Sequence, residues 1–387
     1  MSDPALTVPA FGVRLAGGVD TIDAARWDGL RPDDNPFTSH RFLALMERSR
    51  SAAPRTGWQP VHLAVEAGDD LKAVMPLYLK GHSWGEYVFD HGWAQAYERA
   101  GGDYYPKLQA AVPFTPVPGP RLLARDDEGR HLLAHGLKAV AGQLGVSSAH
   151  VTFCTEAEAL ILERAGFMRR RGIQYHWHNR GYRDFDDFLE TFRSAKRKMV
   201  RKERREAQAL GVRIEVVEGA ALTPNFLAAF YPFYEATVDR RWGSAYLTKA
   251  FFRELGRTMP DDVVMIAAFA PNGEMVAGAL NLRAGDTLYG RLWGALDAYR
   301  FLHFECCYYK AIELAIERGI ARVEAGAQGM HKLQRGYEPV FTHSAHHLAD
   351  PALAQAVRRF LKAEWAGQEE EVVALRASLP FRGAGEG

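Results

Sequence analysis

The sequence predicts an α/β protein with mixed sheets, made of two tandem copies of one folding unit. Two observations support this prediction. A β-hairpin pattern occurs twice, and the same order of helix, strand, short helix and strand follows each hairpin. The length of 387 residues fits about two domains of ordinary size. Apolar residues make up 47% and charged residues 25% of the chain, a composition that excludes a disordered or fibrous protein.

The two hairpins are the clearest part of the repeat. Residues 61–80 read VHLAVEAGDDLKAVMPLYLK, and residues 264–283 read VMIAAFAPNGEMVAGALNLR. In each copy, two apolar runs of strand length flank a short polar turn that contains glycine. The two stretches align without a gap, so we expect both to form antiparallel hairpins.

The elements after each hairpin also correspond. We expect helices over 137–144 and 309–318, closed by the glycines Gly145 and Gly319. Further elements are strands over 149–154 and 321–325, short helices that end at glycine plus an aromatic residue over 162–167 and 333–337, and last strands over 173–178 and 342–348. Each last strand is expected to close the sheet of its own half.

This repeat sets the expected domain organisation. Residues 1–34 form an N-terminal extension, 35–180 the first domain, 181–350 the second domain, and 351–387 a C-terminal helix and tail. The first domain carries an insertion near 87–122 that is rich in glycine, proline and aromatic residues and too long for an idle connection.

Charge and cysteine content limit the partners and the compartment. With 48 Lys and Arg against 47 Asp and Glu, the net charge of +1 attracts neither nucleic acid nor anionic lipid, so only a local patch can do so. Three cysteines are too few for disulfides to stabilise a chain of this length. No stretch fits a secretory signal or a membrane span. We therefore expect a cytoplasmic protein with no membrane span and no DNA partner. The absence of CxxC and HExxH spacings predicts no metal site.

One basic patch lies at the start of the second domain. Residues 193–205 hold eight Lys or Arg and one acid, and apolar residues recur with helical spacing over 185–210. We expect one helix there, capped by Asp184 or Asp186. Its basic face suits the phosphates of a nucleotide-bearing donor or of RNA, although a solvated helix face is the alternative. The candidate phosphate ligands are Lys196, Arg197, Arg201 and Arg205.

Four stretches carry a resemblance to a known family. They are residues 162–167, 185–212, 301–319 and 324–337, and the similarity extends over most of 35–350. The sequence resembles the GNAT acyltransferase fold in tandem, as in the Fem peptidyltransferase (FemAB-like) family and its bacterial N-acyltransferase relatives. The resemblance implies two GNAT-like domains, each with a mixed sheet that splays at its middle. It also implies direct transfer of an acyl group to an amine, without a covalent enzyme intermediate.

One stretch departs from the branch of that fold that uses acetyl-CoA. This branch has a Gln/Arg-x-x-Gly-x-Gly/Ala loop, in which backbone N–H groups and a helix N-terminus hold pyrophosphate. The corresponding residues 295–304 contain no glycine, so the backbone does not easily form that close cradle. The resemblance leaves two donors open, an acyl-CoA or an aminoacyl-tRNA. It implies an amine acceptor that is a small molecule or a peptidoglycan precursor.

The second half holds residues suited to amide formation, which needs a base, oxyanion donors and an acid for the leaving group. By its period of two, the strand over 287–294 places Tyr289, Arg291 and Trp293 on one face, which suits the wall of a cleft. An exposed amphipathic face is the alternative. His303 and Glu305 follow where a helix should begin, either as a base and its partner or as a helix cap.

A denser group of polar residues follows the strand over 321–325. Glu324 ends that strand, and Gln328, His331 and Lys332 come from the glycine-containing loop after it. Together they offer a base, an amide donor and cations. The alternative is a helix entry with a solvated polar surface.

The insertion of the first half suggests a lid that recognises the acceptor. Aromatic and charged residues alternate there in a loop stiffened by proline, with Glu86, Asp90, Tyr105 and Lys107 as candidate acceptor ligands. An Ω-loop packed on its own aromatic residues is the alternative.

These residues predict an N-acyltransferase. Glu324 or Glu305 would remove the proton of the amine, and Tyr289 or Lys332 would serve the leaving group or the oxyanion. The other candidates in the second half would bind the substrates. Two alternatives stay open: a non-catalytic protein that binds RNA or a cell-wall fragment, and a serine hydrolase through Ser83 in a G-x-S-x-G pattern.

Overall fold

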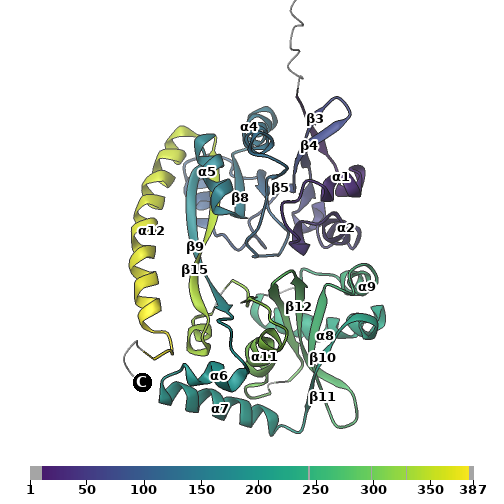
Figure 1. Ribbon diagram of the computed structural model, residues 1–387. Coiled ribbons are helices and arrows are strands. Elements are labelled where there is room, and N and C mark those ends of the chain that lie inside the picture. Colours follow the sequence, from purple (N-terminus) through teal and green to yellow (C-terminus); the bar gives the residue numbers. More distant parts are fainter. Residues whose placement is uncertain (1–10, 243–244, 298, 328, 383–387) are drawn as a thin grey trace, which may run out of the picture.

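The computed structural model describes residues 11–242, 245–297, 299–327 and 329–382. The strands of these residues form two sheets (Figure 1). The smaller sheet has the order β1-β3-β4-β7, and the larger has the order β10-β11-β12-β13-β14-β9-β15-β8-β6-β5-β2. The larger sheet is mixed, because β13–β14 and β6–β8 pair in parallel among antiparallel neighbours. The prediction of an α/β protein with mixed sheets is confirmed.

The first half runs from β1 to β9. Its strands are β1 (Gly12–Ala16), β2 (Gln59–Pro60), β3 (His62–Ala67), β4 (Asp70–Met75), β5 (Leu77–Lys80), β6 (Lys107–Ala110), β7 (Leu123–Ala124), β8 (Ser148–Cys154) and β9 (Met168–His178). Its helices are α1 (Ala24–Asp28), α2 (His40–Arg48), α3 (His91–Arg99), α4 (Asp127–Leu144) and α5 (Glu156–Arg164).

The second half follows with a corresponding order. Its strands are β10 (Arg213–Val217), β11 (Val263–Phe269), β12 (Met275–Ala284), β13 (Thr287–Ala295), β14 (Arg322–Glu324) and β15 (Glu338–Leu348). Its helices are α6 (Phe185–Glu190), α7 (Ser194–Gln208), α8 (Pro224–Trp242), α9 (Lys249–Thr258), α10 (Leu302–Phe304), a π-helix (Glu305–Tyr309), α11 (Lys310–Glu317), a 3-10 helix (Met330–Arg335) and α12 (Pro351–Ala377).

Both predicted hairpins are present. β3 pairs with β4, and β11 pairs with β12, in antiparallel register. Gly68 and Gly273 take positive φ angles of 59° and 87° in the two turns, a conformation that favours glycine. The helices α4 and α11 are followed by Gly145 and Gly319, each at a φ angle of 64°. The repeat of local elements therefore follows the sequence pattern.

The insertion near 87–122 is more regular than the expected loop. It contains the helix α3 and the strand β6, which pairs with β5 and β8 inside the large sheet. All four residues of β6 are buried, including the polar residues Lys107 and Gln109. An apolar pattern does not predict this strand, because polar residues occupy half of it.

The two last strands cross between the halves. β9 pairs with β14 of the second half and with β15, while β15 pairs with β8 of the first half. Each strand therefore completes the sheet of the other half, which corrects the expectation that each closes its own. The two strands run side by side from one half to the other (Figure 1). The predicted boundary near 180 divides the chain but not the sheet.

The basic segment forms two helices instead of the one expected. Asp184 caps α6, since its carboxylate accepts the N–H of Asp187. The chain then turns at Phe192, which is buried against Phe381 and forms a backbone bridge with it. Helix α7 starts after this turn. The contact with the C-terminal segment, which has no local sequence signal, causes the break.

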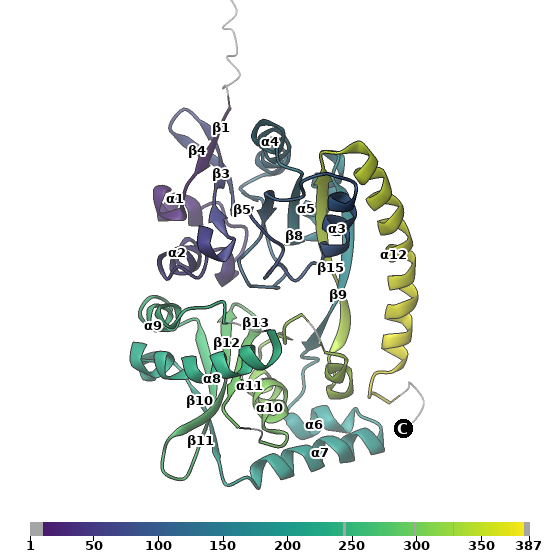
Figure 2. The ribbon, with the colours of Figure 1, turned by 180° about the vertical axis from the view of Figure 1, so that it is seen from behind.

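The C-terminal helix α12 forms over almost the predicted range. It packs along β9 and β15 on the outer side of the sheet, as the view from behind also shows (Figure 2). Arg170 and Arg171 of β9 bind Glu364 and Glu369 of the helix at 2.7 and 3.0 Å. The helix therefore spans both halves and covers the strands that they exchange.

Candidate active site

The geometry of the second half centres on the point where two neighbouring strands separate. β13 and β14 pair in parallel across three residue pairs, and the last pair is Tyr289 with Glu324. There β14 ends, whereas β13 continues to Ala295 without a strand partner on this side in the described part of the chain. Gly290, Arg291 and Leu292 of β13 line a cavity instead.

A β-bulge lies on the other side of β13. The register against β12 shifts between Leu280 and Asn281, so that Arg291 is an extra residue. Beyond the bulge the side chains change sides: Tyr289 packs in one hydrophobic core and Trp293 in another. The predicted common face of Tyr289, Arg291 and Trp293 is therefore wrong, because a period of two does not continue through a bulge.

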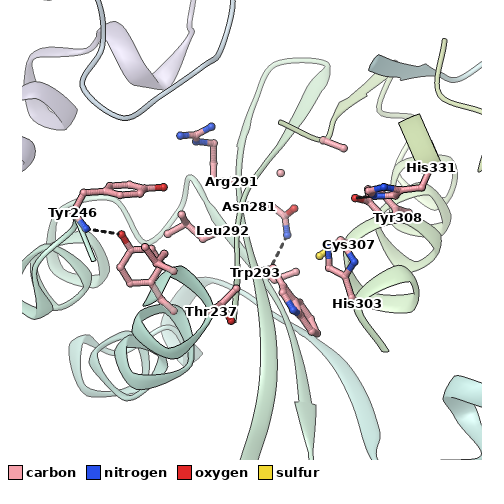
Figure 3. Close-up of a pocket in the computed structure, with 15 residues that line it drawn as sticks. Thr237, Tyr246, Asn281, Arg291, Leu292, Trp293, His303, Cys307, Tyr308 and His331 are labelled. Carbon is pink, nitrogen blue, oxygen red and sulfur yellow. Dashed lines mark hydrogen bonds between the residues drawn. The ribbon is translucent and has the colours of Figure 1, made fainter. Parts of the chain in front are cut away.

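The cavity beside β13 has a volume of about 240 Å³ (Figure 3). Arg291 lines it together with a group of rings, Trp293, His303, Tyr308 and His331. The hydroxyl of Tyr308 lies 2.8 Å from Nε2 of His331. The ring centroid of His303 lies 5.3 Å from that of Trp293 and 5.4 Å from that of Tyr308. Four predicted substrate-binding residues thus come together, namely Arg291, Trp293, His303 and His331.

Glu324 faces a second cavity, of about 400 Å³, which Tyr289, His176 and Arg322 also line. Its side chain is buried, and its Oε2 atom has no hydrogen-bond partner within the described residues. Burial raises the pKa of Glu324 to about 7, although Arg322, 3.2 Å away, opposes this rise. A carboxyl group with such a pKa can accept or release a proton near neutral pH.

His176 does not supply a cation to Glu324. Its Nε2 atom lies 3.8 Å from Oε2 of Glu324, but burial lowers the pKa of His176 to about 3. The imidazole is therefore neutral at pH 7, and it leaves Arg322 as the neighbouring positive charge on this side of Glu324.

Consecutive residues at the end of the β13–β14 pairing line the two different cavities. Tyr289 and Glu324 line one cavity, and the next residues, Gly290 and Ala325, line the other. A β-carbon at Gly290 would lie 3.1 Å from the backbone oxygen of Glu324, so glycine allows close approach of the strands here. Neighbouring residues therefore line different cavities, and the side chain of Glu324 faces the second one.

The remaining catalytic candidates have different surroundings. Lys332 is buried, its Nζ donates to the carbonyl of Gly326 at 2.8 Å, and burial lowers its pKa to about 7. Burial raises the pKa of Tyr289 to about 12, so its hydroxyl stays protonated. Glu305 is held by Arg204 of α7 at 2.9 Å. In the described lining of the cavity beside β13, none of these three appears. Gln328, another candidate, lies outside the described residues.

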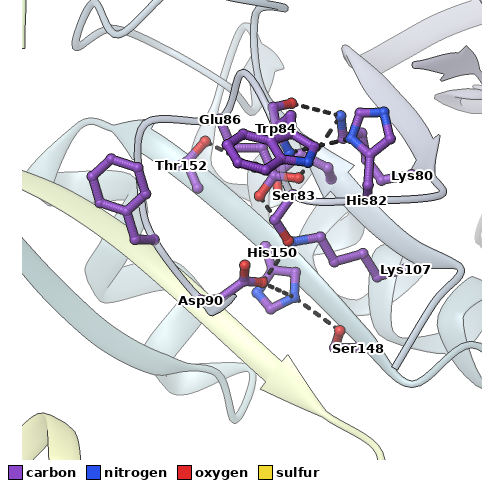
Figure 4. A network of polar contacts seen from close by, with 12 residues as sticks. Lys80, His82, Ser83, Trp84, Glu86, Asp90, Lys107, Ser148, His150 and Thr152 are labelled. Atoms are coloured by element: carbon purple, nitrogen blue, oxygen red, sulfur yellow. Dashed lines mark hydrogen bonds and ion pairs between the residues drawn. The ribbon is translucent and has the colours of Figure 1, made fainter. Parts of the chain in front are cut away.

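The acceptor candidates of the first half form a buried network (Figure 4). Lys107 is fully buried and donates to Asp90, to Ser83 at 2.7 Å and to Glu86 at 2.8 Å. The hydroxyl of Tyr105 lies 2.9 Å from Oγ of Ser83. Burial raises the pKa of Glu86 to about 7. The structure thus gathers these residues beneath the loop over 83–91, and not on an open surface.

The same network bears on the alternative of a serine hydrolase. Burial lowers the pKa of Lys107, but Glu86 and Asp90 outweigh this effect, and its pKa lies above the ordinary value. A lysine that keeps its proton cannot act as the base for Ser83. Ser83 is also buried, and the chain after it turns without forming the helix that a nucleophile elbow requires.

The four phosphate candidates on α7 fall into two groups. Arg197 and Arg201 form ion pairs with acids of α6, at 2.8 and 3.1 Å. Lys196 and Arg205 have no ion-pair partner among the residues that the structure describes, and Arg205 is exposed. The open positive charge of α7 is therefore smaller than the sequence count suggests.

The cavity beside β13 has further lining residues that were not predicted, among them Tyr246, Asn281 and Tyr308. Asn281 lies in an otherwise apolar strand, and its amide donates to the carbonyl of Val264 at 3.0 Å. A polar residue in a buried strand needs such a partner, so its position was a usable signal. The two tyrosines come from segments whose approach to β13 depends on the whole fold.

Comparisons with known proteins identify the family. The model for FemAB-like proteins, described as peptidoglycan biosynthesis/recognition, matches residues 18–383. The chain belongs to the FemAB-like family. Its function therefore lies in peptidoglycan biosynthesis or recognition, and the predicted resemblance to the Fem family is confirmed.

Solved structures share the fold of this FemAB-like chain. FemX is 13% identical in sequence with a TM-score of 0.54, and the match covers 87% of this chain and 98% of FemX. L-PGS from Bacillus licheniformis is 12% identical with a TM-score of 0.51, and the match covers 86% of this chain and 98% of L-PGS. No protein of curated function matches the sequence.

Two features are absent from the described residues. No helix there is both long enough and apolar enough to cross a bilayer. The same residues hold no group of His, Cys, Asp and Glu side chains arranged to bind a metal ion.

Proposed function

We propose that this FemAB-like chain is an N-acyltransferase that forms an amide bond at the end of the β13–β14 pair. The observation that carries the proposal is Glu324, a buried carboxyl group with a pKa of about 7 that lines the second cavity and feels the charge of Arg291, which lines the cavity beside β13. An acceptor amine loses a proton as it attacks a carbonyl group. A base that titrates near neutral pH serves this step well.

The chemistry joins the acceptor nitrogen to the carbonyl carbon of the donor. The C–N bond forms, Glu324 takes the proton of the amine, and the carbonyl oxygen becomes an oxyanion. Collapse of this intermediate breaks the C–S bond of a thioester or the C–O bond of an aminoacyl ester. The leaving sulfur or oxygen then takes up a proton, for which Tyr308 and His331 are candidates in the cavity beside β13. Tyr289 and Lys332 stay further candidates for this role.

The oxyanion requires hydrogen-bond donors close to β13. Arg291 stands in the bulge, and its guanidinium donates a hydrogen bond to the carbonyl of Phe114 at 2.9 Å. A guanidinium carries five N–H donors, so further ones can face the cavity. The backbone N–H groups of the unpaired part of β13 are the second source.

The acyl donor is proposed to bring its phosphates to α7. Arg204 of this helix binds Glu305 and Glu313, and Glu203 binds Arg335 at 2.7 Å. These ion pairs fix α7 against the segments that carry His303 and His331. Both an acyl-CoA and an aminoacyl-tRNA have phosphates that fit this face. The acceptor is a small-molecule amine or a peptidoglycan precursor, and a cytoplasmic location stays a prediction.

A direct assay tests the proposal. The full chain is incubated with an amine-bearing peptidoglycan precursor and, in separate reactions, with acyl-CoA or with aminoacyl-tRNA. The mass of the acceptor is then measured by mass spectrometry. We expect the mass of one acyl or aminoacyl group to be added from one donor class. Glu324→Gln should lower the rate by about 100-fold or more, because it removes the base.

The matched control is Glu317→Gln, which changes an exposed glutamate at the end of α11 and should leave the rate unchanged. No product from either donor, together with binding of RNA or a cell-wall fragment, would instead support a non-catalytic binding protein.

A further inference from the structure

A third cavity, of about 510 Å³, lies between the two halves of the chain. We call it the interhalf cavity. Arg50, Arg55, Trp84 and Phe89 of the first half and Tyr246 and Thr248 of the second half line it. Neither Glu324 nor any residue of β13 belongs to its described lining. It is therefore distinct from the cavity beside β13 and from the cavity that Glu324 lines.

Large aromatic side chains are exposed to solvent at the interhalf cavity. Trp84 is 67% exposed and Phe89 is 52% exposed, although both are large apolar side chains. The ring of His91 contacts both, with centroid distances of 5.3 Å to Trp84 and 6.2 Å to Phe89. Exposed rings that gather at a cavity offer flat apolar surface to a planar ligand group.

The charged residues of this lining are positive. Arg50 and Arg55 are exposed and form no ion pair within the described residues, and the described lining holds no Asp or Glu. Arg48, two residues before Arg50, differs in this respect because it binds Asp20 at 2.6 Å. Two guanidinium groups without acidic partners favour a phosphate or carboxylate ligand.

The backbone takes unusual conformations around the same space. Arg50, Tyr87 and Phe114 line the cavity and have φ angles of 60°, 59° and 56°. Among the described non-glycine residues, five have a positive φ, so three of the five gather here. Side chains of this size rarely adopt the left-handed conformation, and residues that do so cluster at functional sites.

The buried network beneath the loop anchors the chain around Trp84 (Figure 4). Nζ of Lys80 donates to the carbonyl of Trp84 at 3.1 Å, and Lys107 binds Ser83 and Glu86 on either side of that residue. These bonds fix the loop before any ligand arrives. A loop fixed in this way loses less entropy on binding, which favours affinity.

We propose that the interhalf cavity binds an anionic ligand with a planar ring system. Trp84 and Phe89 pack against the ring, and Arg50 and Arg55 bind the anionic group. Tyr246 lines both this cavity and the one beside β13, so a ligand here lies next to the proposed transfer site.

Calorimetric titration of the full chain with 1-naphthyl phosphate tests this proposal. We expect saturable binding that weakens at least 10-fold in the double variant Arg50→Ala/Arg55→Ala and also in Trp84→Ala. Arg48→Ala is the matched control, because it removes a nearby arginine that has an acidic partner, and its affinity should equal that of the wild type. Inorganic phosphate and 1-naphthol should each bind at least 10-fold more weakly, since each makes only part of the contacts.

Two results would overturn the proposal. One is equal affinity of the wild type and the double arginine variant. The other is that folded wild-type chain, checked by circular dichroism, binds neither 1-naphthyl phosphate nor 1-naphthoate at millimolar concentration. A parallel titration with 1-naphthoate shows whether a carboxylate replaces the phosphate, and binding of either anion supports the site. No acyl donor takes part, so failure here is separate from failure of the acyltransferase proposal.

Discussion

At Glu324 a single buried carboxyl group links the stability of the fold to pH. Burial raises its folded pKa from 4.5 to about 7, so between these values the folded chain binds more protons than the unfolded chain. The contribution of Glu324 to the free energy of unfolding is therefore most favourable below about pH 4.5, and it is lost as the pH rises through 7. Ionisation of this buried base at neutral pH therefore lowers the free energy of unfolding.

Glu324→Gln should reduce this pH dependence, because glutamine does not ionise. Between pH 5 and pH 8, the free energy of unfolding of the wild type should fall by roughly 2–3 kcal/mol more than that of the variant. Urea unfolding of both proteins at the two pH values measures the difference. An identical pH dependence would show that Glu324 has an ordinary pKa in the folded chain.

Backbone strain at Arg50 can be tested with two variants that lose the same charge. Its φ angle of 60° suits glycine and strains other residues. We expect Arg50→Gly to be more stable than Arg50→Ala by about 1 kcal/mol, although both lack the guanidinium. Thermal unfolding compares the two variants. An alanine variant as stable as the glycine variant would mean that the backbone at residue 50 is not strained.

At the scale of single elements, β13 positions the proposed site through its contacts on both edges. Its pairing with β14 stops at Tyr289, and its bulge against β12 sets the direction of Arg291 and Trp293. Helix α8 packs against its end. A β-carbon at Gly294 would lie 2.5 Å from the carbonyl carbon of Phe233 in this helix, so the packing leaves no room for a side chain.

Gly294→Ala should therefore destabilise the chain by about 2–3 kcal/mol, because helix α8 must move away from β13. Gly142→Ala is the control: residue 142 lies inside helix α4, no atom stands within 4 Å of the added carbon, and alanine should stabilise the helix by about 0.5–1 kcal/mol. Calorimetric melting of both variants measures these effects. A Gly294→Ala variant with wild-type stability would contradict the close packing of α8.

Elements fixed by local chemistry could be predicted from the sequence, and those fixed by distant contacts could not. The hairpins follow from their turn glycines, and α12 from its apolar period. The bulge at Arg291 breaks a period of two without a local signal. The exchange of β9 and β15 could not be predicted for a further reason: both strands end the same repeated order of elements, so the sequence pattern of each fits either half.

The candidate site divides in the same way. His303, His331 and Trp293 lie near strand ends that the sequence revealed, and the structure brings them to one cavity. Tyr246 reaches that cavity from the segment between α8 and α9, through the arrangement of the whole half. The position of Lys107 could not be predicted, because a charged residue in a loop-like sequence is buried in a strand.

At the scale of the whole molecule, the exchanged strands join the two halves into one sheet. β9 and β15 each complete the opposite half, and α12 packs along both. Neither half keeps a full set of strand partners when the other unfolds. We expect a single cooperative urea transition, with coincident midpoints from far-UV circular dichroism and tryptophan fluorescence. Two separate transitions would show that the halves fold independently.

The pH dependence of acyl transfer tests the role of Glu324 most directly. With the active donor and a saturating acceptor amine whose pKa lies well away from 7, single-turnover rates are measured from pH 5 to pH 9 for the wild type and for Glu324→Gln. The rate of the wild type should rise with an apparent pKa near 7 as Glu324 ionises, and the variant should be slower by about 100-fold without this inflection. A variant with the same rate and the same inflection as the wild type would contradict Glu324 as the base.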